Sequence, residues 1–314
     1  CRRRHKVAII AELNLKFSSR FLRQRNACGM EISMEEKTGS TGSDITSGIG
    51  LSLAREYYEA CGKPMLEEKF REYTGRIAVG FVGRGSDCFG FDDALSEDHD
   101  WGPEFCLFVT ERTFREIGSA LEEAYAGLPA EFQGYHRALR VSTKNKRGVI
   151  CISDFYRSFL GTDCYEEIDW QKAADFSLAA AVNGEVFRDD EGVFSAMRER
   201  LLQGYPEEIR AAKMEESRLL FTRNALYNYP RMWKRGDRLT AKLLLFEGIK
   251  EAMKLAFYRE NKYPPHDKWL YKGIGQLAGG REVAALLGQV EKLLETEPEN
   301  MEAVLEQLKK ISVM

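Results

Sequence analysis

The stretch RIAVGFVGRGSDCFGFDDALSEDHDWGPEFCLFVT, residues 76–110, carries the two features on which the fold prediction rests. The apolar runs at its ends, 76–83 and 104–110, have the β-branched and aromatic content of buried strands. Between them lie a Gly-Ser pair and a loop rich in carboxylates. A solvated acidic loop is one interpretation. A site for metal ions and a phosphate-bearing ligand is the other.

The loop contains the residue types that a triphosphate site needs. Gly85 permits a backbone geometry that other residues resist. A helix that started at Ser86 would direct free amides and a hydroxyl at one point, which favours an anion. Asp98 and Asp100 would point to the same side of an extended chain, and such a pair favours a divalent cation, Mg²⁺ or Mn²⁺. Arg84, beside the turn, could contact a phosphate or form a surface salt bridge.

The rest of the chain predicts two kinds of architecture. GVICIS, residues 148–153, is a third predicted strand, and helical segments separate the strands, as in an α/β or α+β layer. Beyond residue 195 every segment has a helical period. In 239–258 the apolar residues form one broad stripe, wide enough for a bundle core. Its members are Leu239, Leu243, Phe246, Ile249, Met253 and Phe257. We therefore expect a basic extension and linker over 1–50, a first domain over 51–195 and a helical bundle over 196–314.

Composition restricts the partners. The formal net charge of −3 gives no strong signal for nucleic-acid binding, and no apolar run approaches the roughly 18 residues of a membrane span. Seven scattered cysteines, without a Cys-x-x-Cys pair, predict reduced thiols and a cytoplasmic location. Residues 1–29 hold eight basic residues and one acid, which is typical of a targeting segment or of an extension outside the fold. No pattern predicts the oligomeric state.

A resemblance to known proteins joins these features. Gly85-Ser86 followed by Asp98-x-Asp100 resembles the nucleotidyltransferase superfamily of polymerase-β-type and antibiotic-modifying enzymes. GSDCFGFDD and DHDWGPEFCLFV look, more narrowly, like an uncharacterised bacterial family assigned to that fold. The similarity continues through DFYRSFLG, GEVFRDDEGVF, RERLLQGYP and NKYPPHDKWL. It implies a nucleotidyltransferase-like mixed sheet with flanking helices, followed by an all-α bundle.

The resemblance also assigns roles to residues. Gly85 and Ser86 become the triphosphate-side turn, Asp98 and Asp100 the metal-binding pair. Asp154, just past the third strand, becomes a candidate third carboxylate or base, although Ser153-Asp154 also has the pattern of a helix start. The implied reaction moves a nucleoside monophosphate from ATP or another NTP to a hydroxyl or phosphate acceptor. The acceptor would bind between the sheet and the helical tail.

The tail contributes further candidates. Lys268 and Lys272 lie four residues apart, on one face of a predicted helix, where both could contact phosphates.

Two alternative functions use other features. The fold could be a catalytically inactive nucleotide-sensing or partner-binding module. Arg259 and His266 have the spacing of the catalytic pair in helical-bundle (HEPN-type) ribonucleases, where such a pair activates a 2′-hydroxyl.

Overall fold

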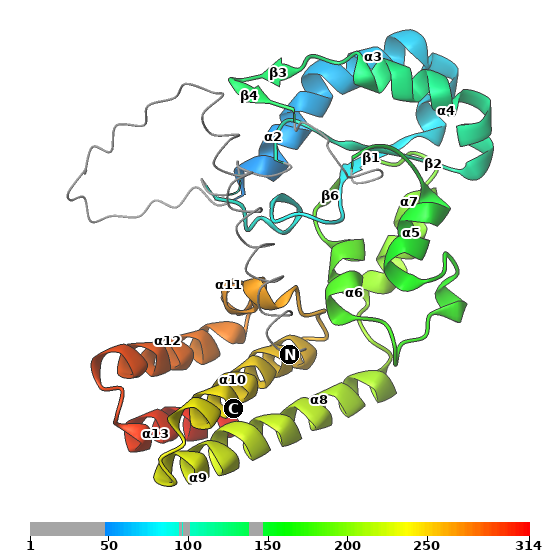
Figure 1. Ribbon diagram of the computed structural model, residues 1–314. Coiled ribbons are helices and arrows are strands. Elements are labelled where there is room, and N and C mark those ends of the chain that lie inside the picture. Colours follow the sequence, from blue (N-terminus) through cyan, green and yellow to red (C-terminus); the bar gives the residue numbers. More distant parts are fainter. Residues whose placement is uncertain (1–47, 94–95, 97–100, 138–146) are drawn as a thin grey trace, which may run out of the picture. The chain divides into compact units, whose positions relative to one another are not determined.

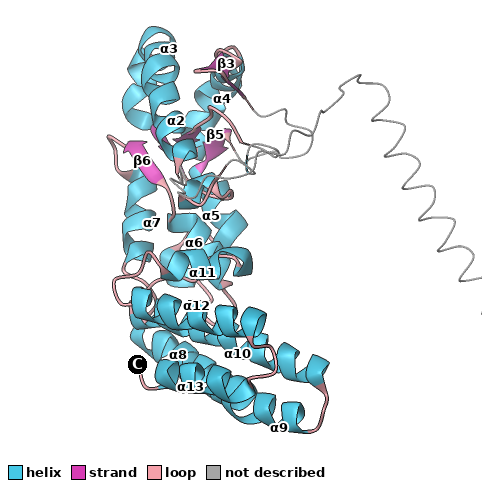
Figure 2. Ribbon diagram, turned by 90° about the vertical axis from the view of Figure 1, so that its left-hand side faces the viewer, coloured by secondary structure: helices cyan, strands magenta, loops and turns pink. Residues whose placement is uncertain are grey.

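The computed structural model describes residues 48–93, 96, 101–137 and 147–314 (Figure 1). The chain divides into two units at Asp44/Ile45, and all described residues belong to the second. Asp98 and Asp100 lie outside the described residues, as does the basic extension. The fold is α+β: a small mixed sheet with flanking helices, then a helical C-terminal region (Figure 2).

The main sheet contains four strands in the order β5-β2-β1-β6. The three strands predicted from sequence are confirmed. Their bounds are β1, Ala78–Phe81; β2, Cys106–Val109; and β5, Gly148–Cys151. β1 is antiparallel to β2, and β5 is parallel to β2. The end of β1 therefore lies at the same edge of the sheet as the starts of β2 and β5.

The edge strand β6 and a short hairpin were not predicted from the sequence. β6, Glu185–Arg188, pairs antiparallel with β1 at the edge of the sheet. All its residues are half-buried, so it lacks the apolar alternation that would predict a strand. β3, Glu131–Phe132, and β4, Tyr135–His136, form a separate two-stranded hairpin.

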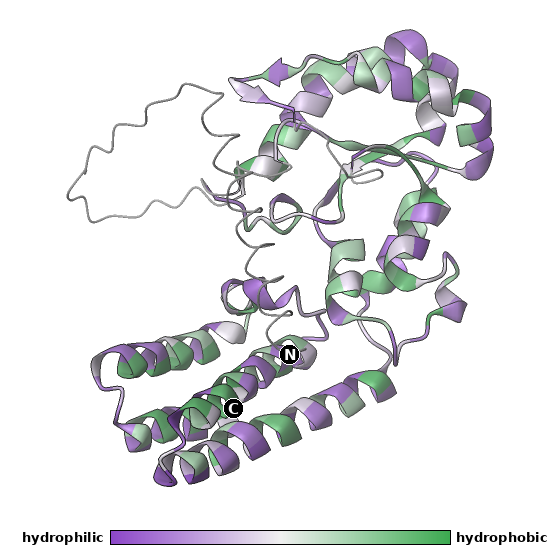
Figure 3. Ribbon diagram, in the orientation of Figure 1, coloured by the Kyte–Doolittle hydropathy of each residue, from purple (hydrophilic) through white to green (hydrophobic). Residues whose placement is uncertain are grey.

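The sheet is covered on both faces, because alternate residues of a strand point to opposite sides. Val79 and Leu107 are partners across β1 and β2 and belong to one core cluster, together with residues of the helices α2, α3 and α4. Ala78 and Phe108 are the next partners and belong to another cluster, with α5, α6 and α7. In Figure 3 the strands β1 and β2 have the colours of apolar residues. The helix bounds are α2, Ile49–Tyr57; α3, Lys63–Lys69; α4, Glu111–Ala126; α5, Ile152–Leu160; α6, Asp175–Val182; and α7, Val193–Leu202.

The C-terminal region has an apolar core built almost entirely from helical residues, with Leu277 contributed by the connection between α11 and α12. α8 continues through a π-helical segment, Thr222–Asn228, into α9. The helix bounds are α8, Glu207–Phe221; α9, Tyr229–Lys234; α10, Arg238–Arg259; α11, Leu270–Ile274; α12, Gly280–Thr296; and α13, Met301–Ser312. A domain boundary at residue 195 stays a prediction.

The apolar stripe on α10 is only partly core. Phe257 is buried, and Ile249 and Met253 pack against the helical core. Leu239, Leu243 and Phe246 are 83%, 60% and 55% exposed, which contradicts the prediction that the whole stripe is covered. At the same end of α10, Ala241 and Leu245 are fully buried in the helical core. The face of α10 that packs against the neighbouring helices is therefore a different one from the face that carries Leu239, Leu243 and Phe246.

One carboxylate links the sheet-side helices to the helical region. Asp175, the first residue of α6, accepts hydrogen bonds from the hydroxyls of Tyr205 and Tyr258, at 2.8 and 2.5 Å, and from Lys213 Nζ at 2.8 Å. Burial, together with Asp175, raises the pKa of both tyrosines, so their hydroxyls remain donors. α6, α8 and α10 thus meet at one largely buried acid.

We expect Asp175→Ala to lower the free energy of unfolding by about 2–4 kcal/mol, because it leaves three donors without their acceptor. Urea denaturation measures the change. Asp169→Ala is the control, since Asp169 forms an exposed pair with Lys172, and its removal should leave the midpoint almost unchanged. Equal effects of the two substitutions would contradict the linking role of Asp175.

Candidate functional site

A turn with two positive-φ glycines follows β1. Gly83 and Gly85 have φ of +119° and +131°, a region that L side chains rarely adopt. A Cβ on Gly85 would lie 2.1 Å from Asp87 Oδ1, so no larger residue fits. Asn183 holds the turn from the start of β6: its Oδ1 accepts from Gly83 N at 2.8 Å, and its Nδ2 donates to Gly83 O at 2.6 Å.

A buried ion pair between Arg147 and Asp87 holds this turn in place. Arg147 Nη2 lies 3.2 and 3.1 Å from the two carboxylate oxygens of Asp87, and both side chains are 5% exposed. The same nitrogen donates to Arg84 O at 3.2 Å, and the guanidinium lies 4.2 Å from the centre of the Phe81 ring. Arg147 directly precedes β5, which is how it reaches the turn after β1. Sequence reasoning missed it, although an arginine immediately before a buried strand was the available signal.

Burial and the neighbouring negative charge shift the pKa of Arg147 in opposite directions. Burial alone would lower the pKa of Arg147, but the neighbouring Asp87 carboxylate raises it above the ordinary value, so the guanidinium remains charged. Burial raises the pKa of the Cys88 thiol well above its usual range. Cys88 therefore remains a neutral thiol and is a poor nucleophile.

Ser86 is half-buried at the end of the glycine turn. The predicted helix after it is a single 3₁₀ turn, Asp87–Phe89, and the Ser86 side chain forms no capping bond there. Its carbonyl accepts from Phe89 N and Phe91 N at 3.1 and 2.8 Å. Its hydroxyl lies 3.4 Å from the Ser96 hydroxyl. The turn is thus rigid in its backbone, while the hydroxyl faces another polar side chain of the acidic loop.

Asp92 is a buried acid that bonds Trp101, the residue directly after Asp100. This carboxylate is 2% exposed, and its Oδ2 accepts from Gly50 N at 2.7 Å and from Trp101 Nε1 at 3.2 Å. Asp92 precedes the two acids and Trp101 follows them. Among the described residues, Asp92 Oδ1 has no hydrogen-bond partner. A buried carboxylate oxygen without a partner is energetically costly and marks a position where a donor or cation would be stabilised.

The structure does not bring Asp154 to this turn. Asp154 lies in the first turn of α5, after the C-terminal end of β5, and is exposed. Because β5 is parallel to β2 and β2 is antiparallel to β1, this end is opposite the edge that carries Gly85 and Ser86. The neighbouring Ser153 bonds Glu111, at the start of α4, at 3.0 Å. The helix-start interpretation of Ser153-Asp154 matches this placement.

The three predicted basic contacts have different surroundings. Lys272 Nζ, on α11, donates to Phe91 O at 3.0 Å and lies 5.7 Å from the Trp269 ring, so the helical region reaches the acidic loop. Lys268 is exposed, with its Nζ 5.2 Å from the same ring. Arg84 is exposed, and its guanidinium lies 5.3 Å from the Phe159 ring.

Arg259 and His266 lie on separate elements. Arg259 ends α10, whereas His266 caps a 3₁₀ turn, Asp267–Trp269, with its Nδ1 accepting from Lys268 N at 3.4 Å. No hydrogen bond or ring contact joins them within the described part of the chain, where the ring of His266 instead contacts Phe176.

In the described ranges no three His, Cys, Asp or Glu side chains are grouped to hold a metal, and no helix there is long and apolar enough to span a membrane.

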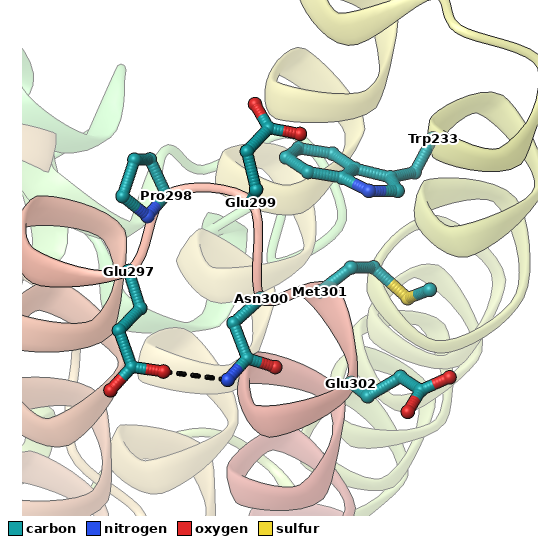
Figure 4. Close-up of a pocket in the computed structure, with 7 residues that line it drawn as sticks. All are labelled: Trp233, Glu297, Pro298, Glu299, Asn300, Met301 and Glu302. Carbon is teal, nitrogen blue, oxygen red and sulfur yellow. Dashed lines mark hydrogen bonds between the residues drawn. The ribbon is translucent and has the colours of Figure 1, made fainter.

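A hollow of about 570 Å³ lies between Trp233 and the α12–α13 connection (Figure 4). Glu297, Glu299 and Glu302 line it, so its charge is unsuited to a triphosphate.

Comparisons with known proteins add one family match. A family model described as a domain of unknown function, DUF4037, matches residues 170–270. The segments GEVFRDDEGVF, RERLLQGYP and NKYPPHDKWL lie within that match. No curated protein matches the chain. The crystal structure of a nucleotidyltransferase-like protein from Exiguobacterium sibiricum is similar at 12% identity and a TM-score of 0.36, over 80% of this chain and 74% of that one. This level of similarity carries no functional argument.

We expect Gly85→Ala to lower the free energy of unfolding by about 1–3 kcal/mol, because alanine at this φ is strained and its Cβ collides with Asp87. Gly75→Ala is the matched control, since a Cβ there meets no atom within 4 Å. Urea denaturation of both variants checks the difference. A Gly85→Ala protein as stable as Gly75→Ala would show that position 85 does not require glycine.

Proposed function

We propose that the chain is a nucleotidyltransferase that moves a nucleoside monophosphate from ATP or another NTP to an acceptor hydroxyl or phosphate. The observation that carries the proposal is the convergence at one edge of the sheet. The Gly83–Ser86 turn, the buried Asp87–Arg147 pair, and Asp92 with Trp101, the residue directly after Asp100, lie together there. The resemblance of this motif to the nucleotidyltransferase superfamily supplies the reaction type.

The described residues would bind the triphosphate in the following way. Gly85 is exposed and has no side chain, so phosphate oxygens can approach the backbone closely at this position. The Ser86 hydroxyl would donate to a phosphate oxygen. Arg84 and Lys272 have no carboxylate partner among the described residues, so their charges are available to the β- and γ-phosphates.

The proposed metal ligands are Asp98 and Asp100. The donor set is oxygen only, which suits Mg²⁺ or Mn²⁺, and the unpartnered Oδ1 of Asp92 adds a buried carboxylate oxygen beside the same segment. When bound, the ion would neutralise charge on the phosphates around the reacting phosphorus. Asp92 would position the ligand pair, since it accepts from Trp101, the residue after Asp100, and from Gly50 N of α2.

A binding function without transfer is the second candidate, and one observation favours it. Asp154, the predicted third carboxylate, lies at the opposite edge of the sheet from the turn. A site without an acid to take the acceptor's proton would bind nucleotide and release no pyrophosphate. Pyrophosphate release from bound ATP, tested across a panel of acceptors, distinguishes the two candidates.

We expect ATP to bind in the presence of Mg²⁺, and Asp98→Asn/Asp100→Asn to reduce that affinity at least 30-fold, on the order of two charge-assisted contacts. Isothermal titration calorimetry, with Mg²⁺ and with EDTA, measures both. Asp163→Asn/Asp169→Asn removes the same charge from exposed surface ion pairs and should bind as the wild type does. Metal-independent binding, or equal binding by the two double variants, would show that the acidic loop is not the triphosphate site.

Lys272 and Lys268 should differ in their effect on ATP. We expect Lys272→Gln to weaken ATP binding by about tenfold, because Lys272 reaches the acidic loop, and Lys268→Gln to weaken it by less than about threefold. The same titrations measure both, and each substitution removes one positive charge. The reverse order would place the phosphates nearer the 3₁₀ turn Asp267–Trp269 than the loop.

A further inference from the structure

A cavity of about 250 Å³ adjoins the glycine turn. Cys88 and Phe89, from the 3₁₀ turn just after Ser86, form one wall. Asn183, whose amide holds Gly83, belongs to a second wall at the end of α6. Asn261 and Tyr263, from the connection after α10, complete it. The cavity is therefore built from both the sheet side and the helical region.

Most of the polar groups in these walls are already bonded to protein. Asn183 uses both ends of its amide on Gly83. Asn261, held at φ +53°, accepts from Tyr205 N at 2.9 Å and donates to Gln203 O at 2.8 Å. The Tyr263 hydroxyl donates to Leu201 O at 2.7 Å. These bonds make the walls rigid and leave them few free polar atoms for a ligand.

The free groups are at the rim. Lys262 and Gln276 are exposed, and neither side chain has a hydrogen-bond or ion-pair partner among the described residues. Among the residues that the structure describes, Lys262 is the one charged side chain that lines the cavity, and none of the lining residues is a carboxylate. Leu202, 45% exposed, and Phe89 add apolar surface. The lining thus combines a preformed apolar wall with a cation and an amide, in a protein of net charge −3.

We propose that this cavity binds a small amphiphilic anion as the acceptor in the transfer reaction: a carboxylate or phosphate ester that has an apolar body and a free hydroxyl. The hydroxyl oxygen bonds to the α-phosphorus of the NTP and loses its proton, while the bond from the α-phosphorus to the pyrophosphate leaving group breaks. Lys262 would pair with the anionic head and Gln276 would hydrogen-bond to it, while Phe89 and Leu202 cover the apolar body. A cationic acceptor would meet Lys262 without a compensating acid. The assignment as acceptor rests on the proposed function; the assignment as an anion site does not.

Three probes of matched size test the charge preference: benzoate, benzamide and benzylamine, titrated into the full chain without nucleotide or Mg²⁺ and followed by ligand-observed NMR. We expect benzoate to bind at least tenfold more tightly than benzylamine, and Lys262→Gln to reduce benzoate affinity about tenfold while benzamide changes little. Leu202→Ser should weaken benzoate and benzamide alike.

Lys242→Gln is the control, because Lys242 is exposed on α10 and lies about 25 Å along the helix axis from Arg259, next to the cavity. It should leave all three affinities unchanged. Equal binding of the three probes, no binding of benzoate, or an equal loss in Lys262→Gln and Lys242→Gln would overturn the proposal. Failure of ATP to bind would overturn the transfer reaction and leave the anion site unaffected.

Discussion

The antiparallel pairing of β1 with β2, and the parallel pairing of β2 with β5, decide which parts of the chain meet. Together they place the turn after β1, the segment that leads into β2 and the residue before β5 at one edge of the sheet. Reversal of either pairing would move Arg147 away from Asp87 and bring Asp154 into the candidate site. Every residue of β1 and β2 is buried, and Ala78 and Val79 pack into the apolar cores on opposite faces of the sheet.

The ion pair between Arg147 and Asp87 is buried, so its formation has a desolvation cost. Removing two charges from water is unfavourable, and a buried pair compensates only when its geometry is good and its other donors are used. Arg147 contacts both oxygens of Asp87, the Arg84 carbonyl and the Phe81 ring. Such a pair is weak evidence of stability by itself. A better explanation for this ion pair is that its contacts with Asp87 and the Arg84 carbonyl hold the glycine turn in shape.

The helical region contacts the sheet side of the molecule in three places, each with a different chemistry. Lys272 reaches the carbonyl of Phe91, tyrosine hydroxyls converge on Asp175, and the residues after α10 line the cavity beside Phe89. The family match over residues 170–270 spans Asp175, Tyr258 and Lys262. It therefore covers the junction between the sheet side and the helices. The glycine turn lies outside it.

Three features could be predicted from the sequence alone: the three core strands, the helical C-terminal region, and a backbone conformation at Gly85 that other residues resist. Each depends on local pattern: apolar runs, a helical period and a backbone position that only glycine fits. Arg147, the contacts of Asp92, β6 and the cavity required the tertiary structure, because each depends on which distant segments meet. The placement of Asp154 and the exposure of Leu239 and Leu243 were settled in the same way. A strand's direction in a sheet, and the partner that covers a helix face, are not encoded in the periodicity of a single segment.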